Sequence, residues 1–225
     1  GFYGAGLKAY DLLAGARGLG PTEWLDSRRA QALLPGVRTH GPVGALQGGV
    51  RYWDGQFDDA RLALLLARTA AARCVVNATG VWVDRITALD QDAAAPAAAR
   101  EPAAHVAPSQ GVHLVVDRAF LPGQHALLVP KTDDGRVLFA VPWLGKTVLG
   151  TTDTPRHDAP REPEAQPDEV AFILREAGRY LARAPQAADV RSVWVGLRPL
   201  VKPPAGAAGD TKAISREHTV WVSRS

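Results

Sequence analysis

The stretch Gly111-Val112-His113-Leu114-Val115-Val116-Asp117 decides the fold of this chain of 225 residues. It is a short run of apolar and β-branched residues, which is typical of a buried strand. Two tight connections later in the chain, Asp133-Asp134-Gly135 and Leu144-Gly145-Lys146, are hairpin signals. They join β-type runs, which we expect at residues 125–130, 137–143 and 147–151. This half of the chain is therefore predicted to be largely antiparallel sheet.

Helices are predicted before and after these strands in the sequence, on one face of the sheet. The pattern of apolar residues favours helices over residues 5–16, from Asp26 or Ser27 to 34, from 58 to about 73, and from 167 to 184. Shorter strands are expected at 48–53, 74–77, 190–196 and 220–222. The predicted fold class is α+β, a mostly antiparallel sheet with flanking helices.

The composition is that of a globular protein with a substantial core, because 46% of the residues are hydrophobic and 22% are charged. The formal net charge is only +3 and the basic residues are scattered, which argues against a nucleic-acid partner. Cys74 is the only cysteine, so an internal disulfide is impossible and an intracellular protein is indicated. The longest apolar region, residues 62–76, follows Arg61 and contains Arg68 and Arg73, so it is too short and too charged to span a bilayer.

The chain has one clear boundary and two abrupt ends. Residues 92–108 are rich in alanine and proline with little periodicity, which predicts a connecting loop. The sequence contains no methionine, begins inside a helix-like stretch and stops after an alternating pattern. We therefore expect this chain to be an internal part of a longer protein.

Two glycine-containing segments could approach a cofactor. Gly4-Ala5-Gly6-Leu7-Lys8-Ala9 has the spacing of a dinucleotide fingerprint, but no strand precedes it, so a helix start is favoured. Asn77-Ala78-Thr79-Gly80, followed by Trp82, comes directly after a predicted buried strand. Its small residues would leave room for a cofactor, or they form a plain strand-to-helix turn. The sequence leaves both interpretations open.

Three further side chains are candidates for chemistry. His113 interrupts an apolar strand, where a polar residue faces solvent or has a buried role, and the residues alone favour a solvent-facing histidine. Arg198 precedes Pro199, which stiffens the backbone and could direct the guanidinium into a pocket. Arg216 could bind an anion or simply pair with Glu217. The six histidines have no spacing that suits a metal ion, so no metal site is predicted.

Several segments, in order, resemble the flavin-dependent glycerol-3-phosphate dehydrogenases, members of the wider D-amino-acid-oxidase-like flavoprotein group. The resemblance covers nearly the whole chain, and its middle segments are specific to the family. The matching segments are residues 5–13, 48–62, 76–83, 108–116, 141–143, 150–155, 196–200 and 215–218.

This resemblance implies oxidation of sn-glycerol 3-phosphate to dihydroxyacetone phosphate, with hydride transfer to FAD and electrons passing on to quinone. It implies an enzyme on the inner face of the cytoplasmic membrane, held there peripherally. His113 and Arg198 match catalytic and substrate-facing positions, with His113 as the candidate base and Arg198 a stabiliser of the alkoxide. Arg216 matches a phosphate-binding position. Asn77, Thr79, Gly80 and Trp82 would contact FAD.

The chain departs from the family pattern in three places. The glycine fingerprint for the FAD pyrophosphate and the later Gly-Gly-Lys-x-Thr-Thr segment do not occur in it, and residue 73 joins residue 74 where the family carries several strands. We therefore expect a substrate or cap domain with remnants of a Rossmann-like FAD domain, which neither holds FAD tightly nor turns over alone. Cap-domain segments are expected at 1–57 and 109–216, an FAD-domain remnant at 58–91, the connecting loop at 92–108 and a return to the FAD domain at 217–225.

Two other functions stay open on the sequence. One is an amine-oxidising flavoenzyme of the same group, in which Arg198 would bind a carboxylate. The other is a non-catalytic module that binds a phosphate-containing ligand or a partner on the same scaffold.

Overall fold

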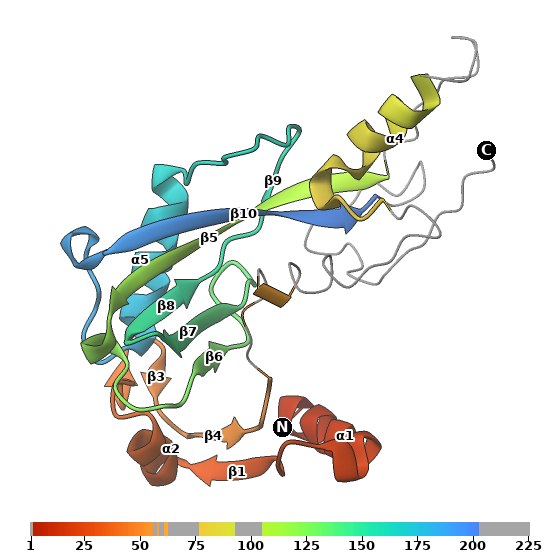
Figure 1. The fold of residues 1–225 in the computed structure, drawn as a ribbon. Coiled ribbons are helices and arrows are strands. Elements are labelled where there is room, and N and C mark those ends of the chain that lie inside the picture. The colour runs from red at the N-terminus through yellow and green to blue at the C-terminus, as the bar shows by residue number, and fades with distance from the viewer. Residues whose placement is uncertain (1, 56–57, 59–60, 63–76, 93–104, 203–225) are drawn as a thin grey trace.

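The computed structural model describes residues 2–55, 58, 61–62, 77–92 and 105–202 (Figure 1). Its centre is a six-stranded antiparallel sheet in the order β10-β5-β8-β7-β6, with β9 pairing β5. The strands are β5 (Val106–Asp117), β6 (Leu127–Val129), β7 (Leu138–Trp143), β8 (Lys146–Gly150), β9 (Thr154–Pro155) and β10 (Ser192–Val201). The predicted antiparallel α+β class is confirmed. The predicted strand at 220–222 and nearly all of the helix and strand predicted over 58–77 lie outside the described residues.

The two predicted hairpins form as expected. Leu144 and Gly145, between β7 and β8, both have positive φ values, of 45° and 77°, as a tight turn between twisted strands requires. Between β6 and β7, the Thr132 N–H donates to the Arg136 carbonyl at 2.7 Å around Gly135.

β5 is longer than the sequence pattern indicated. The predicted connecting loop ran to residue 108, but the strand already begins at Val106 and includes Pro108. Asp84, in helix α4 (Val83–Asp92), accepts hydrogen bonds from the backbone N–H groups of His105 and Val106. Burial alone would raise the pKa of Asp84, but these bonds and the His105 ring contact lower it overall. The acidic side chain therefore fixes the start of β5.

β10 is also longer than predicted, which corrects the placement of Arg198. The sequence placed this arginine after a strand that ended at residue 196, whereas it lies inside β10, opposite Ser109 of β5. Pro199 lies opposite Pro108. A proline is tolerated here because β10 is an edge strand and this position of the ladder needs no N–H donor.

Helix α5 (Pro167–Tyr180) covers one face of the sheet (Figure 1). It begins at a capping box, in which the Gln166 N–H donates to Glu169, and Pro167 occupies its first turn. It ends at Tyr180, four residues before the predicted end, because Leu181 pairs with Val37 in an extended bridge. The main core lies between α5 and the sheet and contains Val112, Leu114, Val116, Leu138, Ala140, Leu149, Ile173 and Ala177.

The N-terminal elements gather beside the sheet (Figure 1). They are α1 (Phe2–Ala14), the 3-10 turn η1 (Gly15–Arg17), β1 (Glu23–Asp26), α2 (Ser27–Leu33), the small β2 (His40–Gly41) and β3 (Gly44–Ala45), and β4 (Gly48–Arg51). Gly4 lies inside α1 against the Trp24 indole, which leaves no room for a Cβ. The glycine-containing segment at residues 4–9 is thus part of a helix, as favoured. Asp26, one of the two caps that the sequence offered, caps α2 by accepting the Arg29 N–H. Within the described ranges, no helix is long and apolar enough to cross a membrane.

Asp117, at the end of β5, should make the stability of the fold depend on pH. It accepts bonds from Lys146 and Arg191 at 2.6 and 2.7 Å, and these bonds lower its pKa to about 2. Because the folded pKa lies below the ordinary value of 3.8, the stabilisation is present above about pH 4 and is lost as the pH falls through about 2. We expect Asp117→Asn to unfold at lower urea concentration than the parent near about pH 6, with the difference shrinking at acidic pH. A difference in urea midpoint that stays constant with pH would contradict this account.

Candidate functional site

The face of the sheet opposite α5 carries the two strongest sequence candidates. Side chains alternate along a strand, and directly opposed residues of antiparallel strands share a face. Val112, Leu114 and Val116 of β5 are buried in the core, so His113 and its alternate neighbours lie on the other face. The register places on that same face Ser109 and Gly111 of β5, Trp194, Gly196 and Arg198 of β10, and Gly150 of β8. We call it the open face.

Arg198 is held over the open face by the chain that follows β8. Its Nη1 donates to the Thr152 carbonyl and its Nη2 to the Thr151 hydroxyl, each at 2.9 Å. The Asp153 carboxylate lies 3.9 Å from Nη1 and itself accepts a hydrogen bond from Ser109. These contacts point the guanidinium along the sheet rather than into solvent.

The guanidinium lies directly over Gly111. A Cβ at Gly111 would be 2.4 Å from Nη2 of Arg198, so a glycine is required for the arginine to lie flat on the strand. On the neighbouring strand, a Cβ at Gly196 would meet nothing within 4 Å. Although Gly111 and Gly196 are cross-strand partners, only the first is constrained by a contact.

His113 is held in the same way by a glycine of β8. A Cβ at Gly150 would lie 2.3 Å from Cδ2 of the imidazole. On its other side, the ring is 5.2 Å from the Trp194 ring, centroid to centroid, at 37°. His113 is half-buried. Burial and then the positive charge of Arg198 lower the pKa of His113 below its ordinary value of 6.5.

The open face therefore brings together a fixed cation and a neutral imidazole. The guanidinium covers position 111 and the imidazole stands at position 113, about 6.7 Å further along the same strand. At neutral pH the imidazole can accept a proton, while the guanidinium can bind an anion or a developing alkoxide. The residues alone favoured a solvent-facing His113, and the structure corrects this by placing it half-buried beside Arg198.

The turn at residues 77–80 forms a compact start to α4. Asn77 donates from Nδ2 to the Val83 carbonyl at 3.0 Å and to the Thr87 hydroxyl at 3.1 Å. Its Oδ1 accepts from the Thr79 hydroxyl at 2.7 Å. Asn77 thus organises the turn that precedes the 3-10 helix η2 (Gly80–Trp82), and the strand predicted before this turn lies outside the described residues.

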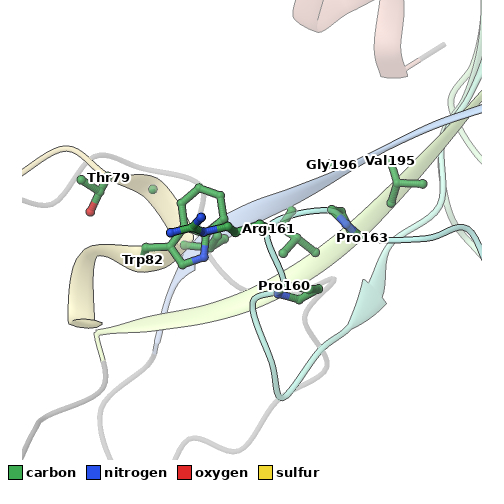
Figure 2. A pocket seen from close by; sticks show the side chains of 10 residues that line it. Thr79, Trp82, Pro160, Arg161, Pro163, Val195 and Gly196 are labelled. Atoms are coloured by element: carbon green, nitrogen blue, oxygen red, sulfur yellow. The ribbon is translucent and has the colours of Figure 1, made fainter. Parts of the chain in front are cut away.

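The other three candidates at this turn line a pocket of about 260 Å³ against the edge of β10. Figure 2 shows Thr79 and Trp82 on one side and Val195 and Gly196 on the other. The lining residues are Thr79, Gly80, Val81, Trp82, Pro160, Arg161, Pro163, Val195, Gly196 and Leu197. Asn77 is not among them.

The pocket is open beside the backbone of Gly80 and is bounded by an anchored tryptophan. Gly80 has a φ of 61° and open space where a Cβ would stand, so a ligand can approach the backbone there. Trp82 is anchored by a hydrogen bond from its indole N–H to the Ala159 carbonyl at 2.9 Å. The volume is below the range usual for a drug-sized ligand, so a whole dinucleotide would not fit in this pocket.

Sequence reasoning missed the residues that hold Arg198 and His113. These are Ser109, Gly111, Gly150, Thr151, Thr152, Asp153 and Trp194. The available signal was the small polar run Gly150-Thr151-Thr152-Asp153 directly after a strand. Arg216, predicted to hold phosphate, lies outside the described residues.

Comparisons with known proteins identify relatives of this chain. The chain is 34% identical to the mitochondrial glycerol-3-phosphate dehydrogenase SDP6 of Arabidopsis thaliana, over 98% of this chain and 40% of the relative. It is also 34% identical to the human mitochondrial glycerol-3-phosphate dehydrogenase, over 100% of this chain and 35% of that protein. The chain thus spans well under half the length of these curated relatives.

Solved structures show the same fold. The glycerol-3-phosphate dehydrogenase of Bacillus halodurans, solved with FAD, superposes with a TM-score of 0.63 at 28% identity, covering 80% of this chain and 42% of that one. Glycine oxidase of Bacillus cereus superposes with a TM-score of 0.57 at 16% identity, over 89% of this chain and 59% of that chain, which shows the fold alone.

The sequence model of the DAO family, described as FAD dependent oxidoreductase, matches residues 69–222. This match includes β5, β8 and β10, and therefore the whole described part of the open face. The chain belongs to the DAO family of FAD-dependent oxidoreductases.

Proposed function

We propose that the holoenzyme containing this chain oxidises sn-glycerol 3-phosphate to dihydroxyacetone phosphate with FAD. The observation that carries the proposal is the convergence of Arg198 and His113 on one half-buried face, with the guanidinium beside an imidazole of lowered pKa. The similarity to glycerol-3-phosphate dehydrogenases over nearly the whole chain supports the choice of substrate.

The reaction removes a proton from the secondary hydroxyl and a hydride from the carbon that bears it. His113 takes the hydroxyl proton, because its lowered pKa keeps the imidazole neutral at physiological pH. Arg198 stabilises the negative charge that develops on the substrate oxygen. When bound, FAD supplies the two-electron acceptor that takes up the hydride.

The residues of this chain would contact the cofactor at two places. Thr79, Gly80 and Trp82 would hold a portion of it in the pocket beside β10, while Asn77 acts through the shape of the turn. Trp194, which is 51% exposed, and Phe139 offer apolar surface on the open face. Contact with that surface would exclude water around His113 and keep its proton affinity low.

Electron transfer onward completes the proposal. Quinone is the proposed acceptor, and a peripheral position on the inner face of the cytoplasmic membrane would give access to it. Both ideas rest on the family resemblance of the sequence. Co-sedimentation of the holoenzyme with liposomes, and reduction of an added ubiquinone analogue by glycerol 3-phosphate, would test them together.

Substitution of Gly111 tests the role of Arg198. Gly111→Ala should displace the guanidinium, because the new Cβ would meet it at 2.4 Å, and lower kcat/KM for glycerol 3-phosphate by about 10–100-fold. Gly49→Ala in β4 offers a matched control away from the open face, since a Cβ there meets nothing within 4 Å, and it should change kcat/KM by less than about twofold. Equal effects of the two substitutions would argue against a placed Arg198.

The lowered pKa of His113 can be measured without turnover. We expect NMR titration to show the His113 ring titrating below 6.5, and Arg198→Met to move that pKa upward because one of its two causes is removed. The activity of the holoenzyme should rise with pH through the same pKa. A His113 pKa that is indifferent to Arg198→Met would show that the guanidinium is not near the ring.

Substrate choice separates the proposal from its rivals. Flavin reduction by glycerol 3-phosphate, and not by glycine or other small amino acids, is the expected result under anaerobic conditions. Reduction by an amino acid would instead favour an amine oxidase in which Arg198 binds a carboxylate. Glycerol 3-phosphate binding without any flavin reduction in the holoenzyme would favour a non-catalytic module.

A further inference from the structure

A buried carboxylate lies behind the open face, on the α5 side of the sheet. Glu169, in the first turn of α5, is only 4% exposed. Its Oε1 accepts from the hydroxyls of Thr152 and Thr154, at 3.0 and 2.7 Å. Its Oε2 accepts from Gln110 Nε2 at 2.7 Å and from the Gln166 N–H at 2.9 Å. One carboxylate thus joins the helix to β5 and to the segment after β8.

Thr152 connects this carboxylate to the open face. Its side chain is buried and donates to Glu169, while the same hydroxyl accepts the Val112 N–H at 3.0 Å. Its backbone carbonyl accepts Nη1 of Arg198 at 2.9 Å. Thr152 therefore contacts Glu169 on the core side through its hydroxyl and Arg198 on the open face through its carbonyl. The Glu169 contact thus helps to set the position of that carbonyl.

The charge on Glu169 matters because all four of its partners are donors. A carboxylate accepts through both oxygens, whereas a glutamine amide has one accepting oxygen and an NH₂ group that only donates. In Glu169→Gln, the side-chain nitrogen would face either the two threonine hydroxyls or the Gln110 and Gln166 donors. The segment between β8 and β9 would then lose part of its attachment to α5.

We infer that Glu169 is a positioning residue, which acts through Thr152 to hold the Arg198 guanidinium over Gly111. This inference rests on the proposed function for the role of Arg198 in catalysis, but the placement of Arg198 can be measured without substrate. It adds a residue on the opposite side of the sheet from the reacting groups.

The first arm of the test is spectroscopic. Removal of the negative charge of Glu169 would by itself lower the pKa of a nearby histidine, whereas displacement of the Arg198 guanidinium would raise the pKa of His113. We expect NMR titration of Glu169→Gln to show a raised His113 pKa. An unchanged or lowered value would overturn the inference.

Glu176 provides the matched control. It is fully buried in the same helix, but its partners are Arg175 and Arg179, which lie away from the open face. Glu176→Gln should leave the pKa of His113 and the kcat/KM for glycerol 3-phosphate unchanged, even where it lowers the melting temperature. If Glu176→Gln raised the pKa of His113 as much as Glu169→Gln, a general loosening of α5 would explain both shifts and the inference would be wrong.

The second arm is kinetic and uses the FAD-loaded holoenzyme. Glu169→Gln should lower kcat/KM for glycerol 3-phosphate about tenfold, yet have less than about a twofold effect when Arg198 is already replaced by alanine. Equal effects in both backgrounds would overturn the inference and leave the proposed function intact. If Arg198→Ala itself changed neither kcat nor KM, the proposed function would fail, whereas the His113 titration would still decide the placement.

Thr152→Val covers the case in which Glu169→Gln does not fold. This substitution removes the hydroxyl that links Glu169 to the segment, with little change of shape. The inference expects Thr152→Val to raise the pKa of His113 and to show the same non-additivity with Arg198→Ala. Additive effects and an unmoved pKa in this variant would overturn it.

Discussion

The pairing of β5 with β10 on one side and β8 on the other is the constraint on which the rest of this structure depends. In this arrangement one face of β5 packs against α5 and the other carries His113. The antiparallel register with β10 then places Arg198 opposite Ser109, so that its guanidinium reaches across to Gly111. A shift of one residue in this register would turn Arg198 toward the core.

The open face is shaped as much by small residues as by the reacting ones. Gly111 and Gly150 leave the space in which the guanidinium and the imidazole lie. Behind the sheet, the Glu169 carboxylate collects donors from three segments and holds the chain between β8 and β9 in place. The site is thus built on both faces of a single sheet. The polar network of Glu169 lies on the α5 side, and His113 and Arg198 lie on the open face.

The sequence predicted the elements better than it predicted their ends. Both hairpins, the antiparallel sheet and the cap of α2 followed from local signals, because turn residues and apolar alternation act over a few neighbours. The ends of β5, β10 and α5 did not, because each is decided by a distant partner. Pro108 and Pro199 continue their strands since they face one another, and α5 stops where Leu181 pairs with Val37.

By itself, the sequence determined the fold class, the candidates His113 and Arg198, and the resemblance to a family of flavoenzymes, because these depend on residue type and order along the chain. Only the tertiary structure decided that the two candidates share a face and that Arg198 lies within a strand. It also showed that Asn77 shapes a turn whose neighbours line the pocket. The physical reason is that convergence depends on strand register and on contacts between residues far apart in the chain, such as Thr152 with Glu169 and Arg198, which leave no local pattern.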